Sequence, residues 1–93
     1  MTPILKDPDA DLRYAMRWPD ALLDGATIAA ASWAIEPDEP GGVTASADFI
    51  DGSETGARFS GGIAGRVYRA ACHIDLSDGC AADRSLVIRV EQV

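Results

Sequence analysis

The feature that most constrains the fold is a strict two-residue alternation near the end of the chain. Between Tyr68 and Leu76 the apolar side chains occupy the even positions: Tyr68, Ala70, Cys72, Ile74 and Leu76. Successive side chains of a β-strand point to opposite faces of a sheet, so this spacing is typical of a strand with one buried face. A second alternating segment ends the chain, with Leu86, Ile88 and Val90 on its apolar side. Asp78–Gly79 lies between the two, so residues 77–84 are predicted to connect them as a hairpin.

Three glycines precede the first of these strands, in the stretch "FSGGIAGRVYRA" at residues 59–70. A phosphate-binding P-loop would need a lysine after its last glycine, and Arg66 follows Gly65 here. A dinucleotide-binding loop would need different glycine spacing and a helix after it, whereas a strand pattern follows. The glycines are therefore predicted to open a strand, with positive φ angles or a close backbone approach.

The N-terminal half begins with a segment that is predicted to be an extended arm. Residues 1–12 contain two prolines and four acidic or basic side chains, a composition that favours neither helix nor regular strand. Alternation then runs through Leu12, Tyr14, Met16 and Trp18, which predicts a first strand that ends before Pro19–Asp20. We therefore expect an arm over residues 1–12 and one β-sandwich domain over residues 13–93.

The next segment, residues 23–37, has the turn residues Asp24–Gly25 near its start and is predicted to continue as a strand. Ile28 has the opposite parity from Trp33 and Ile35, so plain alternation cannot place all three on one face. A β-bulge among Ala29–Ser32 would restore the register. An alanine-rich helical turn is the alternative, because alanine has the highest helix propensity.

The middle of the chain reads as loop, strand, turn and short strand. Residues 36–42 carry two prolines, two glycines and three acidic residues, which predicts a loop. Residues 43–50 alternate, with Val43, Ala45, Ala47 and Phe49 on the apolar side. A turn is expected over residues 51–56 and a short strand over residues 57–59.

Short strands separated by turns every eight to twelve residues predict an all-β fold. We expect a small antiparallel β-sandwich of the immunoglobulin-like or fibronectin-like kind, with six to eight strands. Tyr68 follows a glycine-containing turn, where such sandwiches use a tyrosine hydroxyl to bind backbone and fix the crossing loop. Trp33 is the expected large core residue near it.

Charge limits the kinds of partner. The chain has a formal net charge of −7, and residues 1–56 hold eleven acidic residues against three basic ones. A nucleic-acid backbone would repel such a chain, so nucleic acid is not an expected partner, whereas a basic protein surface is. No apolar run is long enough to span a membrane, and the first residues lack the pattern of a signal peptide. Synthesis in a reducing cytoplasm is expected, with Cys72 and Cys80 as free thiols, although two cysteines leave a disulfide open.

Candidate catalytic chemistry is sparse. His73, the only histidine, could be grouped with Ser77 and Asp75 or Asp78, but these residues lie on one strand and its turn, without a nucleophile elbow. Its parity matches Arg69 and Asp75, which indicates an outward-facing surface residue. We expect no catalytic residue, no metal site and no cofactor, and a binding or structural module rather than an enzyme.

The order of several short motifs resembles that of the small fibre–tail adaptor proteins of tailed bacteriophages, prophages and gene transfer agents. The motifs run along nearly the whole chain: Lys6–Asp7–Pro8, Tyr14 and Trp18, Leu22–Ile28, Ser32–Trp33, Phe59–Tyr68, Gly79 and Asp83–Leu86. The resemblance implies a non-enzymatic virion structural protein, made in the cytoplasm of the bacterial host. It also implies an immunoglobulin-like sandwich in the neck or tail region that holds a fibre or decoration.

This resemblance implies other virion proteins as partners, in an assembly of many copies, and no nucleic acid or membrane. The arm, the 36–42 loop and the edges of the sandwich are the expected contacts, and the Lys6–Arg13 segment is the expected tether. The candidate interface residues are Lys6, Asp7, Asp9, Asp11, Arg13, Glu36, Asp38 and Glu39. The alternative is a carbohydrate- or surface-binding immunoglobulin-like module, which would need exposed aromatic residues in a groove.

Overall fold

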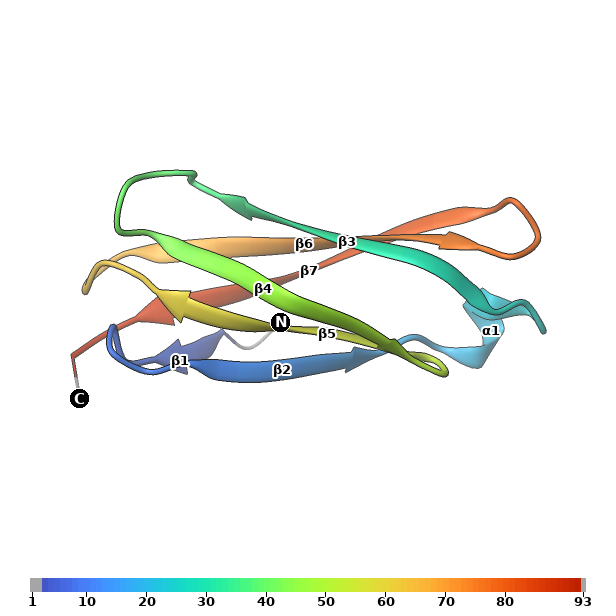
Figure 1. The fold of residues 1–93 in the computed structure, drawn as a ribbon, viewed down its shortest axis with the longest axis horizontal. Helices are drawn as coiled ribbons and strands as arrows, with labels where there is room; N and C mark the ends of the chain where they lie inside the picture. Colours follow the sequence, from blue (N-terminus) through green and yellow to red (C-terminus); the bar gives the residue numbers. More distant parts are fainter. Residues whose placement is uncertain (1–2, 93) are drawn as a thin grey trace.

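The computed structural model describes residues 3–92, which form two facing β-sheets (Figure 1). Within that range, the first sheet has the strand order β1 (Ile4–Lys6), β7 (Ala81–Val90), β6 (Val67–Leu76) and β3 (Ile28–Glu36). The second sheet has the order β2 (Leu12–Arg17), β5 (Glu54–Gly61) and β4 (Val43–Asp51). The predicted small all-β sandwich is confirmed.

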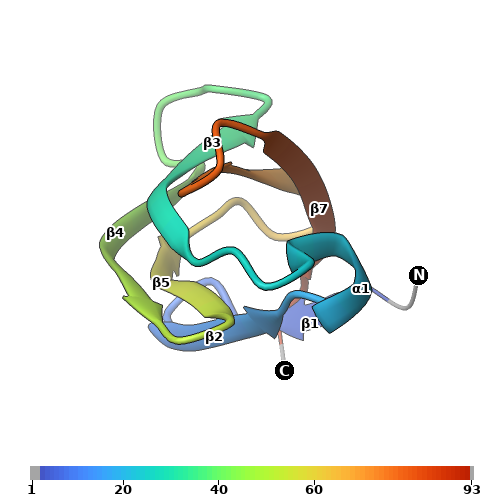
Figure 2. The same cartoon turned by 90° about the vertical axis from the view of Figure 1, so that its right-hand side faces the viewer.

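Pairing within the sheets is antiparallel, apart from β1, which runs parallel to β7. If the strands are lettered A to G in chain order, one sheet is B-E-D and the other A-G-F-C. A constant-type immunoglobulin domain has the sheets A-B-E-D and C-F-G, so the difference lies in the place of the first strand. Viewed end-on, the strands surround one interior, and the short helix α1 (Asp20–Leu23) lies at one end of it (Figure 2).

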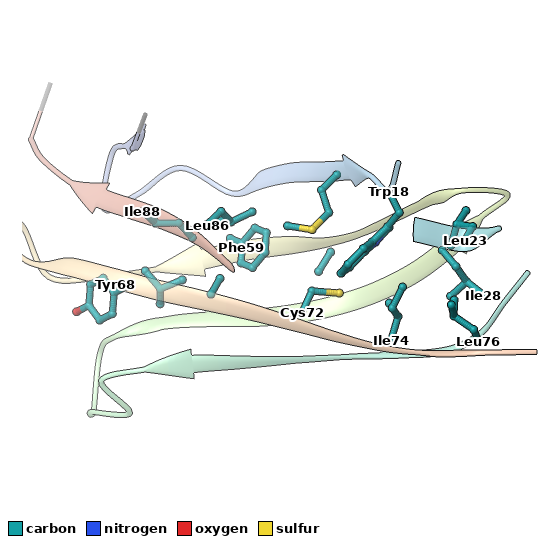
Figure 3. Packing of buried hydrophobic residues seen from close by; sticks show 14 of the residues in the cluster. Trp18, Leu23, Ile28, Phe59, Tyr68, Cys72, Ile74, Leu76, Leu86 and Ile88 are labelled. Atoms are coloured by element: carbon teal, nitrogen blue, oxygen red, sulfur yellow. The ribbon is translucent and has the colours of Figure 1, made fainter. Parts of the chain in front are cut away.

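The two strands with the clearest alternation, β6 and β7, supply much of the core (Figure 3). All five even-numbered apolar residues from Tyr68 to Leu76 are buried, and so are Leu86, Ile88 and Val90 of β7. The predicted hairpin between them is confirmed, and its turn is shorter than expected because β7 already begins at Ala81. The preceding glycines also match the prediction, because Gly61, Gly62 and Gly65 all have positive φ angles.

The largest fully buried side chain among residues 3–92 is a tryptophan from the end of the first predicted strand. Trp18 is fully buried, and its indole Nε1–H donates to Thr55 Oγ1 at 2.9 Å. Trp33, the expected core tryptophan, is only partly buried and packs edge-to-face against Phe59, with ring centroids 5.3 Å apart. Of the two tryptophans, Trp18 is therefore the one that is fully buried in the core.

The bulge predicted in β3 is present. The pairing of β3 with β6 shifts by one residue between Ile28 and Ala30, so Ala29 is the extra residue. After the shift, Ile28, Trp33 and Ile35 all turn toward the core side of the strand. The bulged strand, and not the alanine-rich helical turn, is the correct alternative.

A second bulge, in β4, overturns the expected orientation of Phe49. The pairing of β4 with β5 shifts between Ser46 and Phe49, and Ala47 in that interval has a φ of +49°. Beyond the shift, Phe49 lies opposite Gly56, whose neighbours Thr55 and Ala57 point into the core. Phe49 therefore lies on the outer face of the three-stranded sheet, and the prediction that it shares the inner face with Val43 was wrong.

Two local boundaries also differ from expectation. The turn predicted over residues 51–56 is confined to residues 52–53, because β4 extends to Asp51 and β5 begins at Glu54. Residues 20–23, between the predicted first strand and the predicted Asp24–Gly25 turn, form α1, which starts after Pro19 and ends at Asp24 in the left-handed region. Pro19 is the N-cap residue, with extended backbone (φ −62°, ψ 141°), and its carbonyl accepts hydrogen bonds from the N–H groups of Leu22 at 3.0 Å and Leu23 at 3.2 Å. The helix places Leu23 in the core, at the end where Ile28 and Leu76 also lie (Figure 3).

Part of the segment expected to be an extended arm belongs to the first sheet. Ile4–Lys6 form β1, paired with residues 88–90 of β7, and Leu12 already lies in β2. The Lys6–Arg13 segment expected as a tether thus starts in one sheet and ends in the other. A three-residue edge strand is too short to leave an alternation that the sequence alone could reveal.

Two further findings complete the fold. Cys72 is a buried free thiol and Cys80 an exposed one. Among the described residues 3–92, no helix is long and apolar enough to cross a membrane.

Candidate partner-binding end of the sandwich

Three connections meet at one end of the sandwich, which we call the loop end: residues 7–11, 37–42 and 62–66 (Figure 1). A backbone hydrogen bond from Gly62 N–H to the Gly41 carbonyl, at 3.0 Å, joins the last two of these connections, and one from Gly65 N–H to the Val90 carbonyl, at 2.8 Å, joins residues 62–66 to β7. The fold therefore brings the N-terminal candidate residues and those of the 36–42 loop, about thirty positions apart in sequence, to the same end of the molecule.

Lys6, one of the candidate interface residues, is a structural residue of this end. Its side chain is buried, and its Nζ donates to the Gly61 carbonyl at 2.6 Å and to the Asp7 carbonyl at 2.9 Å. Burial lowers the pKa of Lys6, and the nearby carboxylates of Asp7, Asp11 and Asp9 oppose that effect. The ammonium group thus ties β1 to the end of β5 and is not available to a partner.

Both carboxylate oxygens of Glu39 also interact with other residues of the chain. Its Oε1 accepts a hydrogen bond from the Tyr68 hydroxyl at 2.7 Å, and its Oε2 lies 3.7 Å from Arg66 Nη1. The same hydroxyl accepts from Ile63 N–H at 3.2 Å, which is the tyrosine-to-backbone bond predicted from the sequence. Burial, followed by the hydrogen bond to Glu39, raises the pKa of Tyr68. One buried side chain therefore holds both the 37–42 and the 62–66 loops.

The remaining acidic candidates of the loop end face solvent to varying degrees. Asp7 Oδ1 accepts from Asp9 N–H at 2.9 Å and shapes the turn, while the side chain of Asp9 is exposed. Asp38 is exposed in the 37–42 loop. Glu36, at the end of β3, borders an open hollow of ≈ 500 Å³ whose other lining residues are Pro37, Val67, Tyr68, Arg69 and Val87.

Asp11 and Arg13, the last two candidates, lie at the start of β2 and turn toward the outer face of the three-stranded sheet. Asp11 pairs with Arg58 at 3.0 Å, and the Arg13 guanidinium lies 4.6 Å from the centre of the Phe49 ring. Arg58 and Phe49 were not among the candidate residues. Arg58 could have been found from its cross-strand position, but Phe49 depends on a bulge that the sequence does not announce.

Two apolar side chains near the loop end were also missed. Leu5 is 53% exposed and Val67 is 54% exposed, and both lie opposite Arg89 of β7, so they flank it on the outer face of the four-stranded sheet. Sequence parity indicated an outward side chain at Val67, since Tyr68 points inward. Leu5 gave no such signal, because β1 is too short to show alternation.

His73 lies away from this end, on the outer face of the four-stranded sheet, in agreement with its predicted parity. Its Nδ1 is 2.8 Å from Asp83 Oδ1 on β7, and its Nε2 is 3.3 Å from Asp75 Oδ1. Ser77 instead accepts a hydrogen bond from Thr27 N–H through its Oγ, so the grouping of His73 with Ser77 is not formed.

We expect the pKa of His73 to lie above its ordinary value of about 6.5. The hydrogen bond to Asp83 is the main cause, its charge adds to the effect, slight desolvation opposes it, and Asp75 contributes less. Because the folded-state pKa is raised, the stabilisation is fully present below the unfolded-state pKa and is lost as pH rises through the folded-state value. NMR titration of the ring protons should show the raised pKa, and Asp83→Asn should reduce it more than Asp75→Asn does. Equal effects of the two variants would contradict this ranking.

Comparison with protein families gives a match over most of the chain. Residues 6–89 match the model of a family described as podophage GP4 fiber-tail adaptor protein gp77. The matched range starts at Lys6, the buried residue that ties β1 to β5, and ends one residue before Val90 in β7. It therefore includes the strands β2 to β6 and all three connections of the loop end. No curated protein matches the chain.

Proposed function

Because this chain belongs to the podophage GP4 fibre–tail adaptor family, we propose that it is a non-enzymatic structural protein of a tailed-phage virion. In this role it sits in the neck or tail region and holds a fibre or decoration, in several copies per particle. The observation that carries the proposal is the family match over residues 6–89, which covers the sandwich almost from end to end.

The strand order is consistent with an immunoglobulin-like adaptor. The B-E-D and C-F-G groupings follow the immunoglobulin arrangement, and Tyr68 makes the tyrosine-to-backbone bond of such sandwiches. In such a fold a rigid scaffold carries loops at its ends, and the loops are free to differ between relatives and to meet partners. Here the Tyr68 hydroxyl and the Lys6 ammonium hold the connections of the loop end in place, which reduces the ordering that a partner would have to impose.

We propose the loop end as the surface that meets one virion partner. Its solvent-facing carboxylates, Asp9, Glu36 and Asp38, suit a basic protein surface. Charged groups at the rim of an interface mainly set the association rate and its salt dependence. Lys6 and Glu39 contribute indirectly, because their hydrogen bonds fix the conformation of the connections that carry the solvent-facing residues.

Two experiments test these proposals separately. Mass spectrometry of purified virions should find the protein as a stoichiometric component, and its absence from particles would overturn the adaptor role. For the loop end, Asp9→Lys, Glu36→Lys and Asp38→Lys should together strongly reduce incorporation of the protein into particles. The matched control changes three exposed carboxylates at the opposite end, Asp20→Lys, Asp51→Lys and Glu54→Lys, with the same change in net charge.

If both triple variants enter particles as well as the wild type does, the loop end is not the contact surface. If both fail while remaining folded by circular dichroism, net charge rather than position is responsible, and the assignment to the loop end falls. Loss confined to the loop-end variant supports it.

A further inference from the structure

The outer face of the three-stranded sheet carries a hollow of ≈ 410 Å³ lined by Asp11, Arg13, Ala47, Phe49 and Arg58. These residues come from all three strands or their immediate ends, β2, β5 and β4 (Figure 1). Phe49 lines the hollow, the Arg13 guanidinium lies 4.6 Å from the centre of its ring, and Arg58 is a further lining residue. We call this surface the arginine–phenylalanine hollow.

Two arginines face each other across neighbouring strands in this hollow. Arg13 and Arg58 are directly opposite each other on neighbouring antiparallel strands, an arrangement in which like charges repel. Asp11 compensates Arg58 at 3.0 Å. Arg13 stacks on Phe49, and among the described residues it has no ion pair or hydrogen bond. Within residues 3–92, Arg17, Arg69 and Arg84 also lack a carboxylate partner, so the hollow is distinguished by two facing arginines beside an aromatic ring.

The backbone is shaped to present this aromatic ring outward. The β4 bulge, with Ala47 at a φ of +49°, rotates Phe49 out of the core side of the strand. Gly56 leaves room beneath it, since a Cβ there would lie 2.5 Å from Phe49 Cζ. A non-glycine residue in the left-handed region is strained, so the surrounding structure has to hold Ala47 there. Bulges commonly serve to re-aim a side chain at a functional surface.

We propose that the arginine–phenylalanine hollow binds an acidic segment of a partner protein. A guanidinium group can bind a carboxylate through two parallel N–H···O bonds, and stacking on an aromatic ring fixes its plane in advance. The overall negative charge does not prevent this, because at about 0.15 M salt charges more than roughly 8 Å away are largely screened. The inference rests on the proposed adaptor function and specifies it: an adaptor has to hold two partners, and this surface has the opposite charge character from the loop end.

The probe is a capped hexaglutamate peptide titrated into the isotope-labelled full chain. We expect shifts in the amide signals of β2, β5 and residues 47–49 and in the Nε–Hε signals of Arg13 and Arg58, with weaker binding at higher salt. Arg13→Gln with Arg58→Gln should weaken binding about tenfold or more, since a hydrogen bond to a charged group contributes about 1.5–3 kcal/mol. The control is Arg69→Gln with Arg89→Gln, two exposed arginines on the other sheet that give the same change in net charge.

Several results would overturn the proposal. The first is an absence of shifts at the hollow, and the second is equal weakening by the two double variants. Tighter binding of a single-stranded oligonucleotide of equal charge would indicate a nucleic-acid surface. Shifts that appear on concentrating the protein alone would indicate a second copy of the chain as occupant.

This experiment fails independently of the adaptor role. Hexaglutamate binding needs no virion, so a protein that is found in particles but ignores the peptide disproves only this inference. A protein that binds the peptide but is missing from particles disproves only the adaptor role. Phe49→Leu adds a second readout, because it keeps both charges and removes the stacking surface: it should weaken peptide binding, and unchanged binding would contradict the role of the ring.

Discussion

Replacing Trp18 by alanine should lower the free energy of unfolding by about 3–5 kcal/mol, the range for truncating a buried aromatic residue to alanine. Trp18 is fully buried between the sheets, and its indole N–H is bonded to Thr55, itself fully buried. The variant would lose both the packing of the ring and this hydrogen bond. Domains of this size have a total stability of roughly 5–15 kcal/mol, so the variant should be close to unfolded near physiological temperature. Urea denaturation followed by tryptophan fluorescence and circular dichroism measures the loss.

Thr55 separates the two contributions. Thr55→Val keeps the shape of the side chain but leaves the Trp18 N–H without its acceptor in a dry environment, which costs about 1–3 kcal/mol. Thr55→Ser keeps the hydroxyl and should be closer to the wild type. Arg84, whose guanidinium lies 5.7 Å from the Trp18 ring centre, is exposed, and Arg84→Gln should cost less than either change at the buried pair. If Thr55→Val lowers the free energy of unfolding no more than Thr55→Ser does, the hydrogen bond does not contribute to stability, and packing alone accounts for the effect of Trp18.

The alternating strands could be predicted because they run through the middle of the first sheet. β6 is paired on both sides, to β7 and β3, and one of its faces lies against the core along its whole length. Under those conditions burial imposes period-two alternation on the sequence. The β3 bulge was also predictable, because Ile28 and Trp33 both have to face the core and their spacing allows this only with one extra residue.

The β4 bulge, unlike the β3 bulge, did not interrupt the alternation of apolar residues in the sequence. Val43, Ala45, Ala47 and Phe49 form an unbroken alternation, so nothing indicated that the pairing would shift after Ser46. Alanine is also an uncommon residue at positive φ, where glycine or asparagine would have given a signal. The orientation of Phe49, and with it the arginine–phenylalanine hollow, is decided by tertiary packing and could only be found from the structure.

Sequence reasoning found the segments of the loop end better than the roles of their residues. The 7–11 and 36–42 connections were expected to be exposed, and composition alone indicated this. The burial of Lys6 and the commitment of Glu39 depend on partners 55 and 29 positions away, the Gly61 carbonyl and the Tyr68 hydroxyl. Contacts over such separations have no signature in local spacing, so charged residues that hold the scaffold could not be told from those that face solvent.

Gly62→Ala should strongly destabilise the loop end. Gly62 has a φ of +110°, which residues with a side chain rarely adopt, and an added Cβ would lie 2.7 Å from Val90 Cγ2 and 3.1 Å from Val43 Cγ2. Both valines are buried in the core, and a branched side chain has little freedom to move aside. Backbone strain of about 1–3 kcal/mol is therefore joined by an overpacking cost of about 1–3 kcal/mol. Thermal and urea denaturation measure the sum.

Gly65→Ala is the matched control, three residues away in the same connection. Its φ is +85°, but an added Cβ would meet nothing within 4 Å, so it should show the backbone cost alone. Gly62 N–H also bonds the Gly41 carbonyl, so its displacement should speed amide hydrogen exchange in the 37–42 loop, which Gly65→Ala should leave largely unchanged. Equal destabilisation by the two variants would mean that the contact with Val90 is relieved at no cost. Equal amide exchange rates of the 37–42 loop in the Gly62→Ala and Gly65→Ala variants would mean that the position of Gly62 does not affect the stability of that loop.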